Sequence, residues 1–191
     1  MAGRDGGGWG GGCVAALAGR RIDAPGASVV RFPLAQRDRV RARLLATLRD
    51  RRVRVLVTAA ACGVDLLGLD AAAEIGAARH VVLPFDRARF RRTSVVDRPG
   101  DWGPLFDVIV RDVEAAGWLT ELSLDAEDAG AFLATNVAML DHAAELARAL
   151  GLPLVAVVAW DGTPRDGSDV TLAFRDEARR RGLEVVELST R

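Results

Sequence analysis

The sequence VRVLVTAAACGVDLLGLDAAA, residues 53–73, decides the fold class of this chain. It begins with an apolar, β-branched run that contains Val53, Val55, Leu56 and Val57, which is typical of a strand buried on both faces. It ends with leucines and alanines at helical spacing. Because a buried strand that turns directly into a helix is the repeating unit of α/β proteins, this stretch predicts a parallel sheet covered by helices.

The turn between this strand and helix, residues 58–63 (TAAACG), is built from very small residues. We expect Asp65 to cap the helix. A helix N-terminus attracts anions through its dipole and its free N–H groups, and the small residues would let a phosphate approach. An equally consistent interpretation is that these residues only fit the helix against the sheet. The turn is neither a Walker A loop nor a GxGxxG loop, because Gly63 is its only glycine.

Length and charge limit the functions that the chain can have. Its 191 residues favour one well-packed domain over two, and half of them are hydrophobic. The formal net charge is zero, with 26 basic and 26 acidic residues. Because non-specific binding to nucleic acids needs an excess of basic residues, we expect no nucleic-acid partner.

All 26 basic residues are arginine, and the chain has no lysine. Together with the many alanines and glycines, this composition is typical of the codon usage of a GC-rich genome, so a single arginine is weak support for a binding role. The absence of lysine excludes a Schiff base and a catalytic ammonium group.

The two cysteines and two histidines give little indication of special chemistry. We expect Cys13, in an apolar run, to be a core thiol, whereas Cys62 lies in the small-residue turn, where a helix N-terminus could lower its pKa. His80 and His142 have no cysteine or carboxylate at metal-ligand spacing, so we expect no metal site. The sequence shows no signal peptide and no long apolar span, which predicts a cytoplasmic protein without membrane contact.

The rest of the chain repeats the pattern of strand followed by helix. Residues 1–12 are mostly glycine and are predicted to be a disordered tail. Residues 118–122 alternate in polarity, as an edge strand does. The pattern predicts one Rossmann-like three-layer α/β domain over residues 13–191, with a mostly parallel sheet. Its strands are expected at 13–18, 53–57, 80–83, 118–122, 154–160 and 183–188, and its helices at 34–50, 65–75, 101–116, 128–150 and 170–181.

Small and polar residues follow four of the predicted strands. In a parallel sheet the carboxyl ends of the strands share one edge, where ligands bind. Any α/β protein presents a polar rim there, but several suitable groups together favour a ligand site. The candidate ligand-binding residues are Gly19, Arg20, Arg21, Asp23, Thr58, Ala59, Ala60, Ala61, Cys62, Gly63, Asp65, Pro84, Phe85, Trp160, Asp161 and Gly162.

Each kind of residue has a role in this hypothesis. The small turn would hold a phosphate, and the neighbouring Arg20 and Arg21 would supply positive charge. A carboxylate, Asp23 or Asp161, would accept hydrogen bonds from ribose hydroxyls. The aromatic rings that could stack on a base are those of Trp160 and Phe85.

The order of several short motifs resembles a known group of domains. Residues 57–65, VTAAACGVD, are similar to the strand and SGGARGID turn of the DprA family, with alanine in place of the glycines. Further motifs are GRRID at 19–23, VLPF at 82–85, Arg91 with Thr93, Ser94 and Val95, and WDG at 160–162. In this order they resemble the SLOG group of bacterial Rossmann-like domains, which includes the DprA and LOG families, over about residues 13–190.

This resemblance implies a nucleotide-derived ligand at the first two strand–helix turns. Some SLOG domains are thought to sense signalling nucleotides beside an effector domain, which implies a role in bacterial signalling or defence. Self-association or a separate effector protein would both be consistent with it, and we expect no cofactor. DNA binding is not expected, because the net charge is zero and alanines replace the glycines.

Two hypotheses follow, and the sequence favours the first. The first is a non-catalytic binding or sensing module for a nucleotide-derived ligand, such as an adenine or ADP-ribose type of molecule. The second is an N-glycosidase acting on nucleotides, as in LOG-like relatives, with Asp65, Glu74 or Asp23 as the acid. The PGGxGTxxE motif of those relatives, which supplies their catalytic glutamate, has no counterpart in this chain, so no catalytic residue is assigned.

Overall fold

Residues 11–191 are described by a computed structural model, and residues 1–10, most of the predicted tail, lie outside the described part. Within residues 11–191 the chain forms a six-stranded sheet with the order β4-β3-β2-β1-β5-β6, and every pair of neighbouring strands is parallel. The prediction of a Rossmann-like α/β fold is confirmed. The strands are β1 (Cys13–Gly19), β2 (Val53–Thr58), β3 (Ala78–Leu83), β4 (Leu119–Glu121), β5 (Leu154–Trp160) and β6 (Glu184–Ser189).

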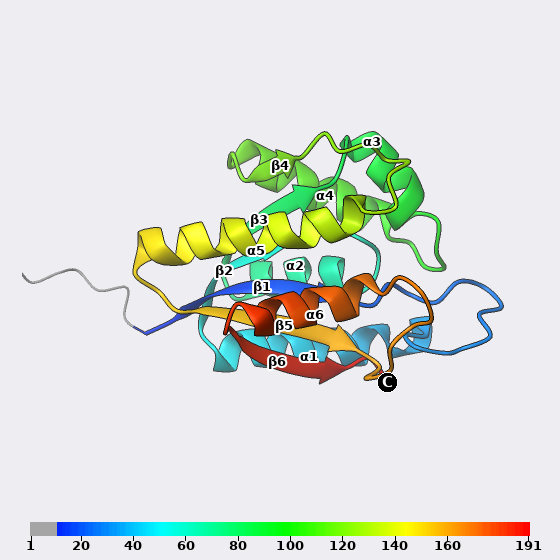
Figure 1. Cartoon of the computed structure of the whole chain (residues 1–191), viewed down its shortest axis with the longest axis horizontal. Coiled ribbons are helices and arrows are strands. Elements are labelled where there is room, and N and C mark those ends of the chain that lie inside the picture. The colour runs from blue at the N-terminus through cyan, green and yellow to red at the C-terminus, as the bar shows by residue number, and fades with distance from the viewer. Residues whose placement is uncertain (1–10) are drawn as a thin grey trace, which may run out of the picture.

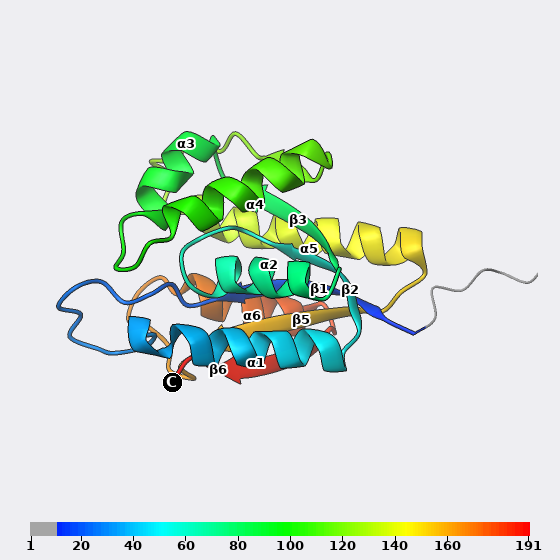
Figure 2. The same ribbon diagram turned by 180° about the vertical axis from the view of Figure 1, so that it is seen from behind.

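Helices cover both faces of the sheet. Figure 1 shows α5 (Ala131–Leu150) and α6 (Val170–Arg180) in front of it. Figure 2, the view from behind, shows α1 (Arg37–Asp50), α2 (Val64–Glu74) and α4 (Gly103–Ala115) on the other face. Each layer buries its own apolar cluster against the sheet. The shorter helical segments are η1 (Leu34–Gln36), α3 (Arg87–Phe90) and the π-helical turn η2 (Arg91–Val95).

The central strand β1 is buried on both faces, which explains its continuous apolar sequence. Ala15 and Leu17 pack into the cluster under α1, α2 and α4, whereas Val14 and Ala16 pack into the cluster under α5 and α6. Helix α2 approaches β1 so closely that a Cβ on Gly68 would lie 2.1 Å from a methyl carbon of Leu17. A glycine at this point lets α2 lie directly on the strand.

The direction in which the chain winds changes at β1. This strand pairs with β2 on one side, with Ala16 opposite Val57, and with β5 on the other side, with Gly19 opposite Ala159. Helix α5 carries the chain from the edge strand β4 back to β5 on the other side of β1. Open α/β sheets bind ligands at the carboxyl ends of the strands where the order reverses, so the ends of β1, β2 and β5 are where a site is expected.

The structure differs locally from the predicted elements. Helix α2 begins after Gly63, so Asp65 lies in its first turn and is not its cap. Residues 87–95, to which the sequence assigned no element, are helical. The predicted edge strand is confirmed, because β4 lies at one end of the sheet order. Among the described helices, none is both long enough and apolar enough to cross a membrane.

Candidate functional site

The small-residue turn is fixed against the end of β1. Arg21 forms an isolated antiparallel bridge with Gly63. Gly63 has a φ of 107°, and a Cβ at this position would lie 2.7 Å from the carbonyl oxygen of Arg20. A side chain here would strain the backbone and push the two segments apart, so this glycine serves contact within the chain.

Two N–H groups of the turn and the first N–H group of α2 have partners inside the protein. They belong to residues that were expected to offer free donors to an anion. The donors and acceptors are the N–H of Ala61 with a carboxylate oxygen of Asp65 (3.2 Å), that of Cys62 with the carbonyl of Ser94 (2.9 Å) and that of Val64 with the carbonyl of Arg20 (3.2 Å). The prediction that the backbone donors are free for an anion is therefore wrong for these three groups.

A cavity of about 220 Å³ lies beside this turn, at the carboxyl ends of β1 and β2, and we call it the main cavity. The N-terminal turns of α5 and α6 form its opposite wall. Phe90, Phe132 and Met139 supply an apolar and aromatic part of its lining. Its polar lining includes Asn136 and Thr171, and such a mixture is typical of sites for small molecules.

Asp65 is a buried carboxyl group in the wall of the main cavity. The residue is 8% exposed, and its Oδ2 accepts the N–H of Ala61. Burial raises its pKa to about 7, against the opposing effects of that hydrogen bond and of the positive charge of Arg21. At neutral pH both protonation states are populated, so Asp65 can donate a proton or a hydrogen bond as well as accept one.

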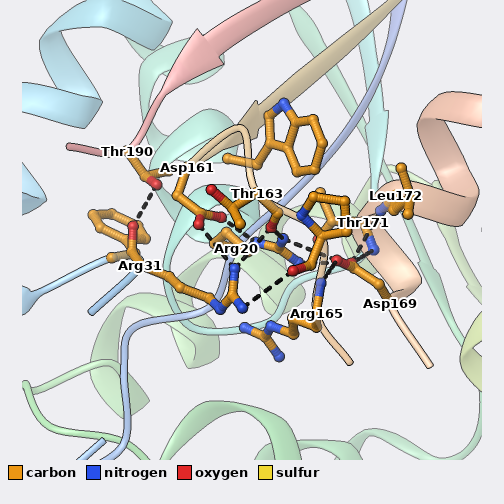
Figure 3. A network of polar contacts seen from close by, with 12 residues as sticks. Arg20, Arg31, Asp161, Thr163, Arg165, Asp169, Thr171, Leu172 and Thr190 are labelled. Carbon is orange, nitrogen blue, oxygen red and sulfur yellow. Dashed lines mark hydrogen bonds and ion pairs between the residues drawn. The ribbon is translucent and has the colours of Figure 1, made fainter. Parts of the chain in front are cut away.

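Arg20, Asp161 and Asp169 form a buried network, which Figure 3 shows together with its neighbours. The Nε of Arg20 donates to Asp161 at 2.9 Å, Nη1 donates to Asp169 at 2.6 Å, and Nη2 donates to Asp169 at 2.9 Å and to the carbonyl of Thr163 at 2.8 Å. Every nitrogen of this guanidinium is therefore used within the protein. Arg20 lines the main cavity, but its charge is already neutralised there.

Asp169 links this network to α6. Its side chain accepts the N–H groups of Thr171 at 3.1 Å and Leu172 at 3.0 Å, so it caps the helix. It also accepts the backbone N–H of Arg165 at 2.8 Å. Burial opposes ionisation, but the hydrogen bonds from Arg20 and from these N–H groups outweigh it and lower the pKa of Asp169 to about 2.

Arg165 and Arg21 also line the main cavity, and their guanidinium groups make fewer contacts within the protein than that of Arg20. Within residues 11–191 the side chain of Arg165 makes no hydrogen bond and no ion pair. Its partial burial and the nearby charges of Arg20, Arg31 and Arg98 lower its pKa. Arg21 forms an ion pair with Asp97, and its Nη2 also lies 3.6 Å from the sulfur of Cys62. These two guanidinium groups are the cations that a ligand in the main cavity would meet.

The structure brings some of the candidate residues to the main cavity and leaves others outside it. Asp23 lines a second cavity, together with Arg21. The candidates in the lining of the main cavity are Gly19, Arg20, Arg21, Ala59, Ala61, Asp65 and Pro84. Those that line neither cavity are Thr58, Ala60, Cys62, Gly63, Phe85, Trp160, Asp161 and Gly162.

The candidates outside the cavities have structural contacts. The hydroxyl of Thr58 donates to the carbonyl of Leu17 at 2.8 Å. The indole N–H of Trp160 donates to Glu187 at 2.7 Å, and the residue is 4% exposed. Cys62 is fully buried, and burial raises the pKa of its thiol, which is opposite to the direction that the sequence suggested. Cys13 is buried in the core as expected.

Several residues that line the main cavity were not predicted from the sequence. They come from the N-terminal half of α5, from the loop before α6 and from the first turn of α6. The polar loop 161–169 was visible at the end of a strand, but nothing in its composition marks which residue turns toward a cavity. These residues are Phe132, Thr135, Asn136, Met139, Arg165, Ser168 and Thr171.

The two histidines, which are distant in sequence, contact each other away from this site. Nδ1 of His80 lies 2.9 Å from Nε2 of His142, and the ring of His80 stacks on Trp118. Burial and the neighbouring imidazole lower the pKa of His80 to about 4, so it is neutral at physiological pH. Within residues 11–191, no group of three or more His, Cys, Asp or Glu side chains is placed to hold a metal ion.

The fold and site together define a Rossmann-like α/β protein with an arginine-bearing cavity at the point where the strand order reverses. Among solved structures, the chain is similar in fold to the X-ray structure of DNA processing protein A (DprA) from Streptococcus pneumoniae, with 15% identity and a TM-score of 0.40. The match covers 92% of this chain and 58% of that chain. A scan against models of protein families gives no match, and neither does a search of curated proteins.

Proposed function

We propose that the protein binds a nucleotide-derived, anionic small molecule in the main cavity. The observation that carries this proposal is the guanidinium of Arg165, which lines the cavity without an ion pair inside residues 11–191. An arginine beside other arginines raises the electrostatic energy of the folded protein unless an anion joins it. A phosphate would accept charge-assisted hydrogen bonds from Arg165 and Arg21.

The other residues that line the main cavity would suit a ligand with a heteroaromatic base. The exposed ring of Phe132, at 38%, offers a stacking surface, and Met139 adds a polarisable side chain beside it. Asn136 donates through Nδ2 to the carbonyl of Val170 at 2.8 Å, which leaves its Oδ1 to accept from an amino group. A molecule with a flat ring at one end and a phosphate at the other would match this division of the wall.

A thermal-shift screen tests the proposal. It uses AMP, ADP-ribose, NAD, cyclic dinucleotides and guanosine tetraphosphate, with mass spectrometry of each mixture afterwards. A ligand present at 100 times its dissociation constant adds about 2.7 kcal/mol to the stability of the folded state, which is easily measured. If no compound of the screen shifts the unfolding temperature, the proposal fails.

A blocking variant locates the site. Ala61→Phe places an aromatic side chain in the lining of the main cavity, whereas Ala73→Phe places the same side chain on the exposed surface of α2. We expect Ala61→Phe to weaken binding of the best compound at least tenfold and Ala73→Phe to leave it unchanged. If Ala61→Phe is folded by circular dichroism and binds normally, the main cavity is not the site.

Asp65 supports a second candidate function, an N-glycosidase acting on the bound nucleotide. Of the three acids considered from the sequence, Asp65 alone lines the main cavity. Glu74 is paired with Arg41 and Arg49, and Asp23 lines the second cavity and accepts the N–H groups of Arg31 and Phe32. A carboxyl group with a pKa of about 7 could protonate a leaving base.

Mass spectrometry of the ligand separates the two functions. An enzyme would release a free base, and Asp65→Asn would abolish that release while a bound nucleotide still shifts the unfolding temperature. A binding module would return the ligand intact. Because of the missing catalytic motif, we favour the binding module.

A further inference from the structure

A second cavity of about 210 Å³ adjoins the main cavity, and we call it the arginine cavity. Its lining includes four arginines, Arg21, Arg31, Arg98 and Arg165, and a single carboxylate, Asp23. Arg21 and Arg165 also line the main cavity, so these two side chains stand where the two cavities meet. A ligand that reached past them from the main cavity would enter a space lined by more arginines than carboxylates.

The hydrogen-bonding capacity of these arginines is incompletely used. The Nε atoms of Arg21 and Arg98 are buried and have no hydrogen-bond partner within residues 11–191. Both arginines share one carboxylate, since Asp97 pairs with Arg21 and lies 3.4 Å from Nε of Arg98. Buried donors without partners are rare in folded proteins, and each one costs stability unless a ligand or water satisfies it.

The carboxylates near the cavity neutralise its arginines only in part. Oδ2 of Asp23 is engaged by the backbone N–H groups of Arg31, at 3.0 Å, and Phe32, at 2.9 Å. Asp161 is taken by Arg20 and Arg31. Arg31 is thus paired, whereas Arg165 has no counter-ion among residues 11–191, and Arg21 and Arg98 must share theirs. The position offers charge and donors to an additional anionic group.

We propose that the arginine cavity is a subsite for a second phosphoryl group, so that the ligand of this protein is a nucleoside diphosphate or a diphosphate-linked derivative and not a nucleoside monophosphate. This inference rests on the proposed function. The first phosphoryl group lies at Arg21 and Arg165, and the second lies in the arginine cavity, where Arg98 donates to it. No bond is formed or broken in this step.

Isothermal titration calorimetry with matched nucleotides tests the subsite. AMP is compared with ADP, and GMP with GDP, on the unaltered chain, on Arg98→Gln and on the control Arg92→Gln. Arg92 is exposed on the same segment and lines neither cavity. We expect the diphosphate of the preferred base to bind at least tenfold more tightly than its monophosphate. Arg98→Gln should reduce this ratio to below threefold without changing monophosphate binding, and Arg92→Gln should preserve it.

The outcomes separate this inference from the proposed function. If the monophosphate binds and the diphosphate binds no more tightly, or if Arg98→Gln preserves the ratio, the subsite is refuted and the proposed function stands. If none of the four nucleotides binds, the subsite is refuted, and the thermal-shift screen alone then decides the proposed function. Inorganic pyrophosphate decides the source of the diphosphate: binding as tight as that of ADP or GDP would support the subsite and refute the nucleoside part of the proposed function.

Discussion

Arg20 and Arg165 line the same cavity, yet the positive charge of Arg20 is paired with carboxylates and that of Arg165 is unpaired within residues 11–191. Arg20 is buried, and all of its guanidinium nitrogens donate within the buried network, whereas the side chain of Arg165 has no such partner in the described part of the chain. The first arginine holds the end of β5 and the start of α6 against the end of β1. The second is available to a ligand. Residue type and position at the sheet edge therefore do not distinguish a structurally paired arginine from one whose side chain is left unpaired.

The largest effect is expected from breaking the buried network. Asp169→Ala removes the carboxylate that receives two nitrogens of Arg20, and it leaves a buried cation with reduced pairing. We expect a loss of about 3–5 kcal/mol in the free energy of unfolding, measured with urea. The control Asp176→Ala removes an exposed partner of Arg175 on the same helix and should cost at most about 1 kcal/mol. Equal losses would show that the network contributes no more than a surface pair.

The same network should respond to acid. The pKa of Asp169 is lowered to about 2 in the folded protein, from 3.8, so its contribution is present above pH 4 and is lost as the pH falls toward 2. The unfolding free energy of the unaltered chain should decrease in this window. Asp169→Ala should show a smaller decrease there, because the group that titrates has been removed.

Asp65 should show the opposite pH dependence, with the second largest effect. Its pKa is raised to about 7 on folding, so the folded state binds the proton more tightly than the unfolded state. Its contribution to stability is favourable to folding at low pH and is lost as the pH rises from 4 to 7. We expect Asp65→Asn to remove a decrease of about 3–4 kcal/mol over this range, since each pKa unit corresponds to about 1.4 kcal/mol. Parallel pH profiles for the two proteins would contradict the assignment.

A smaller loss of stability is expected where Gly63 of the small-residue turn packs against Arg20 and Arg21, the two residues that follow β1. Gly63→Ala adds a Cβ that would lie 2.7 Å from the carbonyl oxygen of Arg20, at a positive φ. We expect a loss of about 2–3 kcal/mol, measured by urea unfolding. Gly76→Ala is the matched control, because it has a φ of 71° but no atom within 4 Å of the added Cβ. It should cost only about 1 kcal/mol, and an equal cost at both positions would mean that the contact is unimportant.

The sequence predicts the fold well because parallel strands are buried on both faces. Continuous apolar runs as short as those of β1 and β5 have few other interpretations, and the alternating polarity of β4 correctly marks an edge strand. The sequence predicts the ends of helices and strands less accurately where they meet a turn. Gly63, and not Asp65, precedes α2, because close packing of the turn on β1 needs a residue without a side chain.

The site is only partly predictable for a different physical reason. Arg20 and Arg21 are adjacent in sequence, but the partners that separate their roles, Asp97, Asp161 and Asp169, lie between 76 and 149 residues away. Arg165 was overlooked because it is one of 26 arginines in a chain without lysine. Only the folded arrangement shows that, of the arginines lining the main cavity, Arg165 is the one without a counter-ion within residues 11–191.

The smallest effect on stability is expected from removing the charge of Arg165. Arg165 is only partly buried, makes no side-chain ion pair within residues 11–191 and lies near Arg20, Arg31 and Arg98. Arg165→Gln should therefore change the unfolding free energy by less than about 0.5 kcal/mol. The change should be a gain at low salt that disappears at high salt, because it comes from relieved repulsion between charges. Urea unfolding at both salt concentrations measures it, with the exposed Arg92→Gln as the control for loss of one arginine. A loss of 2 kcal/mol or more would place Arg165 with Arg20 as a structural arginine, and the contrast between the two would not hold.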